Sequence, residues 1–186
     1  MIWLLGLLAV AVGAYLIWAY NSLVKLRAMT DAAWADIDVQ LKRRHDLIPS
    51  LVETVKGYAA HERGTLEKVT EARTRALSAS GPAARALAEG MLTQALHSLL
   101  AVAETYPRLR AVENFTQLQT QISAVEDQIQ LARRFYNAAV RDFNTRIAQF
   151  PSNLVARLFN FWRREFFEAE GDERESPPVQ FEALRK

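Results

Sequence analysis

The chain of 186 residues lacks cysteine entirely and contains only three histidines. Without a thiol it has no disulfide, iron–sulfur cluster, cysteine zinc site or cysteine nucleophile. His45, His61 and His97 are never three or four residues apart, so no helix carries the His-x-x-x-His spacing of a zinc pair. Phosphate-binding, dinucleotide-binding and Gly-x-Ser-x-Gly motifs are also absent. We therefore expect no catalytic residue, no cofactor and no metal ion.

A bend of the chain at Pro49 leaves one alternative open. It would bring Glu53, His61 and Glu62 toward His45, and imidazole and carboxylate groups are common metal ligands. A metal-dependent enzyme built from these residues is the least favoured of the functions considered.

Charged side chains are absent from Ile2 to Tyr20. At about 1.5 Å per residue a helix of this length spans about 28 Å, close to the hydrocarbon thickness of a bilayer. Aromatic residues, which prefer the membrane interface, lie toward its two ends: Trp3, Tyr15, Trp18 and Tyr20. We predict that residues 1–20 form a transmembrane anchor and that residues 2–20 contact the lipid bilayer.

No lysine or arginine precedes the apolar run, so the basic region of a secretory signal peptide is missing. The run is also longer than a usual signal core, which favours an uncleaved anchor over a cleaved signal. Lys25 and Arg27, followed by the basic run 42–44, lie on the other side. The positive-inside rule therefore favours a short N-terminus outside the cell and a cytoplasmic domain, and the opposite orientation stays open.

Acidic and basic residues are nearly balanced, with a formal net charge of +2. Nucleic-acid binding needs lysine and arginine gathered without intervening carboxylates, so we expect no nucleic-acid partner. The densest basic segment is 42–46, which is expected to pair with nearby carboxylates more than with lipid. We further hypothesise that charges beside the apolar stripes fix the register between helices: Asp36, Asp38, Arg43, Arg44, Asp46, Glu71, Arg73, Glu104, Glu113, Arg133 and Arg134.

Apolar residues after Asn21 recur every three or four positions, which predicts helices and an all-α fold. One helix is expected from about Pro107 to before Pro151, with solvated polar residues such as Glu126 between the members of its coiled-coil-like seam. That seam is Phe115, Leu118, Ile122, Val125, Ile129, Ala132, Tyr136, Ala139 and Phe143.

Three further apolar stripes lie upstream, and Pro49 separates the first two, so it either kinks a helix or starts a new one. A loop at 78–82 precedes the third, which ends near Tyr106. Because short connections make long helices pack antiparallel, we predict an elongated bundle over residues 21–170, an unbroken helix leading into it from the anchor, and a charged flexible tail at 171–186. The stripes are Trp34, Ile37, Leu41 and Ile48; Val52, Val55, Ala59, Glu62, Leu66 and Val69; and Leu87, Met91, Leu92, Leu96, Leu99 and Ala103.

An aromatic segment at 158–167 surrounds two arginines. It is expected to be either a helix in a membrane interface or partner groove, or a final helix covering one end of the bundle. Its candidate contact residues are Phe159, Phe161, Trp162, Arg163, Arg164, Phe166 and Phe167.

Many short motifs, in order, resemble the LemA family: YNSLV at 20–24, AWADIDVQLKRR at 33–44, DLIP at 46–49, VKGY at 55–58, AETYP at 103–107, ARRFYN at 132–137 and FPSN at 150–153. Ser50 and Trp162-Arg163-Arg164 depart from the family pattern. The resemblance implies a helical domain behind one N-terminal membrane helix in the bacterial inner membrane, with no accepted catalytic centre.

The favoured function is a noncatalytic, single-pass membrane-anchored scaffold or interaction protein, self-assembling into an oligomer or binding a membrane protein partner. The alternative is a regulatory adaptor for a membrane protease or signalling enzyme.

Overall fold

The computed structural model describes residues 2–168, which form six helices and no strand. The all-α prediction is confirmed. The predicted tail at 171–186 lies outside the described residues, and the division into anchor, bundle and tail stays a prediction. The helices are α1 (Ile2–Tyr58), α2 (Arg63–Ser78), α3 (Pro82–Glu104), α4 (Pro107–Arg110), α5 (Glu113–Ala148) and α6 (Ser152–Leu158).

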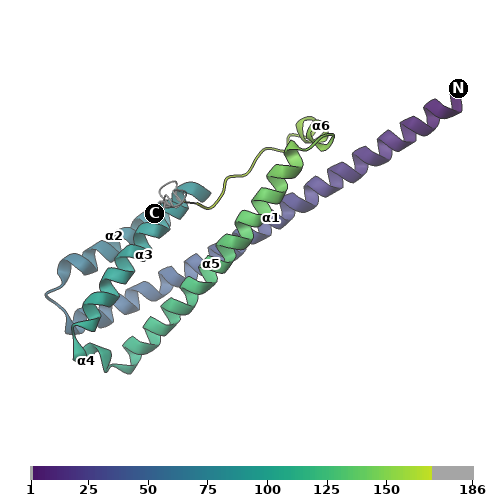
Figure 1. The fold of residues 1–186 in the computed structure, drawn as a ribbon. Coiled ribbons are helices and arrows are strands. Elements are labelled where there is room, and N and C mark those ends of the chain that lie inside the picture. Colours follow the sequence, from purple (N-terminus) through teal and green to yellow (C-terminus); the bar gives the residue numbers. More distant parts are fainter. Residues whose placement is uncertain (1, 169–186) are drawn as a thin grey trace, which may run out of the picture.

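Helix α1 is a single helix of 57 residues that extends far beyond the bundle at its N-terminal end (Figure 1). Its first part stands alone and its apolar side chains are exposed, whereas one face is buried from Ala19 onward. The helix therefore runs from the apolar segment into the core without a break, as predicted.

Pro49 lies inside α1, where it neither ends the helix nor starts a new one. A proline has no backbone N–H, so the carbonyl of His45, four residues earlier, loses its helical donor. The Nε of Arg73, on α2, donates to that carbonyl oxygen at 2.9 Å. The guanidinium thus replaces the missing backbone donor. The chain breaks instead at 59–62, so the stripe expected on one helix from Val52 to Val69 is divided between α1 and α2.

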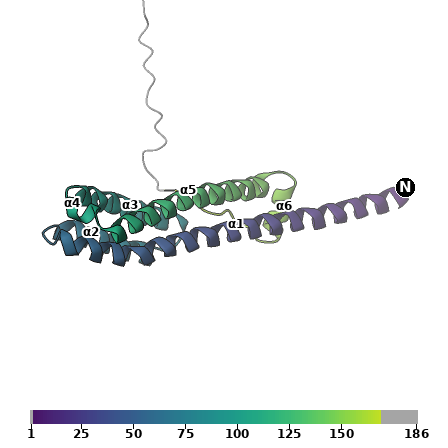
Figure 2. The same cartoon turned by 90° about the horizontal axis from the view of Figure 1, so that it is seen from below.

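Helices α1 and α5 lie side by side and antiparallel, and α2 and α3 form a hairpin at the end of the bundle away from the N-terminus (Figures 1 and 2). One apolar cluster joins this hairpin to the C-terminal part of α1 and the start of α5. A second cluster joins the middle of α1 to α5, and a third joins the emerging part of α1 to α6 and the end of α5. The core is therefore a long row of packed residues.

Helix α5 begins at Glu113, six residues after the predicted start at Pro107, because α4 forms a separate short turn first. The predicted seam is buried from Phe115 to Phe143, with Ala132 half-buried. On α3 the buried stripe differs from the prediction. Leu87 and Met91 are exposed, and Ala86 and Glu89 take the inward positions.

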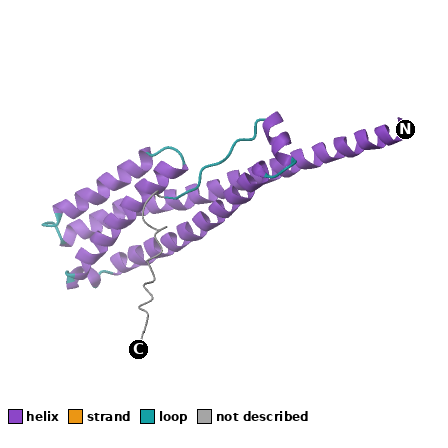
Figure 3. Ribbon diagram, turned by 45° about the horizontal axis from the view of Figure 1, so that its top comes forward, coloured by secondary structure: helices purple, strands orange, loops and turns teal. Residues whose placement is uncertain are grey.

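The aromatic segment is not a helix beyond Leu158, contrary to both expectations. Asn160 has a left-handed φ of 57°, which asparagine tolerates, and the N–H of Phe161 donates to the Ala156 carbonyl at 2.9 Å. This arrangement ends α6 and redirects the chain. The segment then runs back toward the α2–α3 hairpin as the long loop in Figure 3.

Two asparagines of α5 hold this returning segment. The side chain of Asn144 accepts from the N–H of Arg164 and donates to its carbonyl, both at 2.9 Å. Asn137 does the same for Phe167, at 2.9 and 3.3 Å. Each asparagine side chain thereby satisfies the backbone N–H and carbonyl of one residue, as a neighbouring strand would in a sheet.

We predict that Arg73→Met is destabilising by about 1.5–3 kcal/mol, because the His45 carbonyl loses a charged donor. In a Pro49→Ala background, Arg73→Met should lower the free energy of unfolding by clearly less, because Pro49→Ala restores the backbone N–H at position 49. Chemical denaturation of the four proteins measures this coupling. Equal losses in both backgrounds would contradict the compensating role of Arg73.

Candidate functional site

A cluster of charged side chains lies buried where α1, α3 and α5 meet. Arg44 is 1% exposed and pairs with Glu89 of α3 and with Glu126 of α5, the latter at 2.5 Å. Its Nη1 also donates to the hydroxyl of Thr93 at 2.8 Å. The Nε2 of His45 lies 3.0 Å from the second oxygen of Glu89. One arginine thus ties three helices together in the middle of the bundle.

The carboxyl of Glu89 is ionised within this cluster. Burial by itself would raise its pKa, but the contact with His45 and the charge of Arg44 outweigh burial and lower the pKa below the usual 4.5. A buried ion pair of this kind contributes little net stability over an apolar pair, yet removing one partner leaves an uncompensated buried charge. The cluster therefore joins α1, α3 and α5 by contacts whose loss on either side is costly.

The segment 42–46 was expected to pair with carboxylates, and Arg44 and His45 do so with adjacent helices. Glu126, assigned to the solvated face, instead contacts Arg44. Glu89 was missed. Its signal was available, because it lies three residues before Leu92 and seven before Leu96, at an apolar-stripe position.

The proposed metal ligands are not brought together. His45 faces Glu89, Glu53 is exposed and pairs with Lys56 at 3.5 Å, and Glu62 accepts from the Tyr106 hydroxyl at 3.2 Å. His61 is exposed in the loop between α1 and α2. Within residues 2–168, no three histidine or carboxylate side chains are arranged to hold a metal ion.

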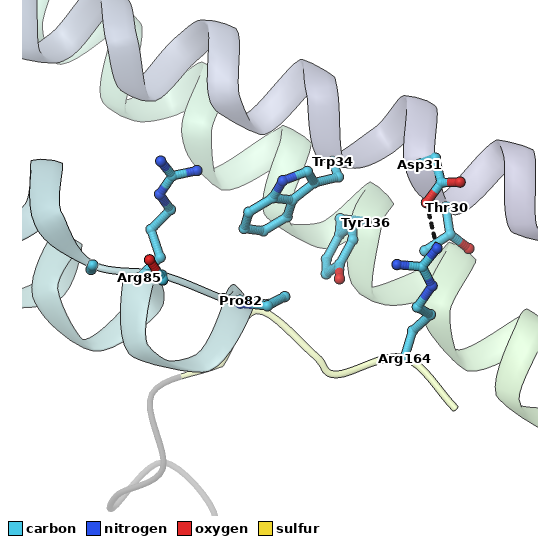
Figure 4. A pocket seen from close by; sticks show the side chains of 10 residues that line it. Thr30, Asp31, Trp34, Pro82, Arg85, Tyr136 and Arg164 are labelled. Atoms are coloured by element: carbon cyan, nitrogen blue, oxygen red, sulfur yellow. Dashed lines mark hydrogen bonds and ion pairs between the residues drawn. The ribbon is translucent and has the colours of Figure 1, made fainter. Parts of the chain in front are cut away.

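A second polar region is a cavity of about 350 Å³ where α1, the 79–82 loop, α5 and the returning segment converge. Figure 4 shows the rings of Trp34 and Tyr136 at its centre, with Arg85 and Arg164 on either side. The ring centroids are 5.3 Å apart. Arg85 lies 5.6 Å from the Trp34 centroid and pairs with Asp38, and Arg164 pairs with Asp31 at 2.7 Å.

These contacts make the cavity a structural junction. The Tyr136 hydroxyl donates to the Glu165 carbonyl at 2.9 Å. Burial, together with the carboxylates of Glu165 and Asp31, raises the pKa of Tyr136 above its usual 10 despite the nearby Arg164, which further favours the protonated phenol that donates this hydrogen bond. Both guanidiniums are engaged with carboxylates. The contacts around the cavity thus hold the returning segment against α1 and α5.

Of the charges assigned to register, Arg44, Arg73, Asp38 and Arg133 do join different elements, Arg133 by donating to the Phe167 carbonyl at 3.1 Å. Glu71 pairs within its own helix, with Arg75. Arg43, Asp46 and Arg134 are not buried in the core. Fewer of these charges join different elements than the sequence indicated, and their role in fixing register stays a prediction.

The third region is the end of the bundle from which the apolar part of α1 emerges. The N-terminal part of α1 is long and apolar enough to cross a bilayer, and almost all of it is exposed. Helix α3 is also long and apolar, but its leucines at 92, 96 and 99 pack in the bundle core. Of these two helices, α1 is the one that presents a continuous apolar surface outward.

These features define a class of protein, namely a membrane-associated helical bundle with an N-terminal apolar helix. The sequence profile of the LemA family matches residues 33–181, and the chain belongs to this family.

Curated relatives are similar over most of this chain. Magnetosome protein MamQ 2 of Paramagnetospirillum magneticum is 29% identical over 203 residues, covering 94% of this chain and 75% of the relative. Protein LemA of Metamycoplasma hominis is 28% identical over 158 residues, covering 83% of this chain and 71% of the relative. The resemblance found from the motifs is confirmed.

We predict that Arg44→Met lowers the free energy of unfolding by about 3–5 kcal/mol, because Glu89 then remains buried without its partner. The double variant Arg44→Met/Glu89→Met should recover much of this loss. Thermal or chemical unfolding of both variants and of the single Glu89→Met variant provides the measurement. A double variant as unstable as the sum of the single ones would contradict a buried pair.

The lowered pKa of Glu89 also predicts a pH dependence. A carboxyl whose pKa is lower in the folded state contributes stability above its unfolded pKa of 4.5, and this contribution is lost as the pH falls through the folded pKa. Glu89→Gln lacks this contribution. The stability difference between the parent protein and Glu89→Gln should therefore be largest near neutral pH and shrink below about pH 4.5. A difference independent of pH would contradict an ionised Glu89.

Proposed function

We propose that the protein is a noncatalytic scaffold that is anchored in the bacterial inner membrane by α1 and acts by contacting other protein chains. The observation that carries this proposal is the unbroken path of α1 from its exposed apolar residues into the bundle core. A continuous helix has no flexible linker, so the anchor and the α1 portion of the core move together. Such a protein holds a binding surface at a set distance and direction from the membrane.

The contacts of the buried polar side chains support a noncatalytic role. The buried titratable groups of the described chain, above all Arg44, His45 and Glu89, are turned toward one another and join helices. The arginines at the Trp34 cavity are likewise paired with carboxylates. Their arrangement is that of structural contacts.

Exposed apolar side chains on the bundle support contact with other chains. Leu131 and Phe135 on α5 are about half exposed, and their spacing of four places them on one helix face. We propose that the α5 pair contributes to self-association, with a regulatory adaptor that binds a different membrane protein as the alternative.

The orientation proposed is a short N-terminus outside and a cytoplasmic bundle. Lys25 and Arg27 follow the apolar segment directly. Basic residues close in sequence to a membrane span are retained preferentially on the cytoplasmic side. These two residues support the proposed orientation.

Light scattering of the full-length chain in detergent micelles, combined with size exclusion, tests self-association. We expect discrete oligomers, and expect Leu131→Glu/Phe135→Glu to reduce their mass because two charges would be buried in the interface. Leu77→Glu, a similarly exposed leucine on α2, is the matched control. A monomeric parent protein would contradict self-association and favour the adaptor alternative, for which partner capture is the next step.

Fusions at the C-terminus test the orientation. A green fluorescent protein fusion should fluoresce and an alkaline phosphatase fusion should be inactive, because the first folds in the cytoplasm and the second needs disulfides that form outside it. The reverse pair of results would place the bundle outside the cytoplasm.

A further inference from the structure

Large apolar side chains are exposed at the corner formed by the end of α5, α6 and the residues that follow. Phe150 is 80% exposed, Leu158 68% and Trp162 75%, and Leu154 is also more than half exposed. Leu154 and Leu158 are four residues apart in α6 and so share one helix face. Single exposed apolar residues are ordinary on a protein surface, whereas a group of this size at one corner indicates a binding surface.

The opposite face of α6 fixes this corner against α1. Val155 and Ala156 are buried in the same cluster as Ala19 and Leu23 of α1. The ring of Phe159 lies 4.8 Å from that of Tyr20. Figures 1 and 2 show α6 beside α1 at the point where α1 leaves the bundle.

This contact places the corner at a defined depth relative to the anchor. The side chains of α1 are predominantly exposed from Ile2 to Trp18, and burial begins at Ala19. At about 1.5 Å per residue, this exposed part of the helix spans about 26 Å, close to the ~30 Å hydrocarbon core. When α1 crosses the bilayer, residues 18–20 and the α6 corner packed on them lie at the boundary between acyl chains and headgroups.

The charges around the corner suit that boundary. Arg157 is exposed and lies three residues after Leu154, on the same side of α6, and Arg163 follows Trp162. Arg146 stacks on Trp18 at 4.6 Å. Tryptophan and arginine favour the headgroup level, where an apolar surface and a hydrogen-bond donor are satisfied together. These guanidiniums also attract anionic headgroups.

We propose that the α6 corner, formed by Phe150, Leu154, Leu158 and Trp162 with Arg157, is a second membrane contact that inserts into the headgroup region beside α1. The proposal rests on the membrane anchoring proposed above. It replaces the contact set expected from sequence, because Phe161 and Phe167 are buried within the chain and Arg164 is paired with Asp31.

Two contacts with the bilayer would fix the orientation of the bundle more completely than a single contact does. A single tilted helix can rotate about its own axis, whereas a second contact beside it fixes which face of the bundle is turned toward the membrane. The exposed α5 pair would then be presented in the same direction by every copy.

The absence of cysteine makes a direct test possible, because each introduced cysteine is the only one in the chain. Leu154→Cys and Leu158→Cys are spin-labelled in the full-length protein, reconstituted in vesicles of phosphatidylcholine and phosphatidylglycerol. Accessibility to apolar oxygen and to a water-soluble nickel chelate is then measured by electron paramagnetic resonance. Leu8→Cys is the control inside the anchor, and Leu87→Cys is the control on an exposed part of the bundle.

The measured quantity is the ratio of oxygen accessibility to nickel accessibility at each label. We expect this ratio at positions 154 and 158 to be several-fold higher than at position 87 and lower than at position 8. Labels at 154 and 158 that resemble the label at 87 would overturn the second contact while leaving the anchor intact. Labels shielded from both reagents would also overturn it, since they would indicate a protein partner at the corner. A nickel-accessible label at 8 would instead show that the anchoring itself is wrong.

Discussion

The continuity of α1 is the constraint on which the rest of the structure depends. A proline within it removes one backbone donor, and the His45 carbonyl that it frees would otherwise lie unpaired in the bundle. Arg73 provides the replacement from α2. The same hydrogen bond therefore satisfies the His45 carbonyl within the continuous helix α1 and joins α1 to α2. The position at which α1 lacks a backbone donor is thus a point of contact between the two helices.

The interior of the bundle combines apolar packing with directional polar contacts along its length. Three apolar clusters follow one another along the bundle, and apolar packing alone allows neighbouring registers in long helices. Arg44 pairs with Glu89 and Glu126, and Asn137 and Asn144 hydrogen-bond to the returning segment. These polar contacts are directional, so each needs its two partners at matching positions along the bundle.

Polar residues that resemble functional groups in the sequence are largely accounted for by these contacts. His45, within the basic segment, faces a glutamate of another helix, and the arginines of the Trp34 cavity are paired with aspartates. The exposed apolar surfaces are of another kind: the first part of α1, the α6 corner and the pair formed by Leu131 and Phe135 on α5. These surfaces support a role in membrane and protein contact.

The sequence by itself determined the helical class, the apolar N-terminal segment, the loop before Pro82 and the family, because periodicity, charge depletion, turn residues and motifs are local signals. Three features depended on tertiary structure. Pro49 stayed within a helix because Arg73 donates a hydrogen bond to the carbonyl that lacks its helical donor. Glu89 lies at an apolar-stripe position, but its charge is accommodated there because Arg44 and His45 lie opposite it. Residues 159–168 form an extended segment because two asparagines of α5 hydrogen-bond to its backbone. In each case a residue remote in sequence satisfied a polar group, and no local pattern records which partner will be near.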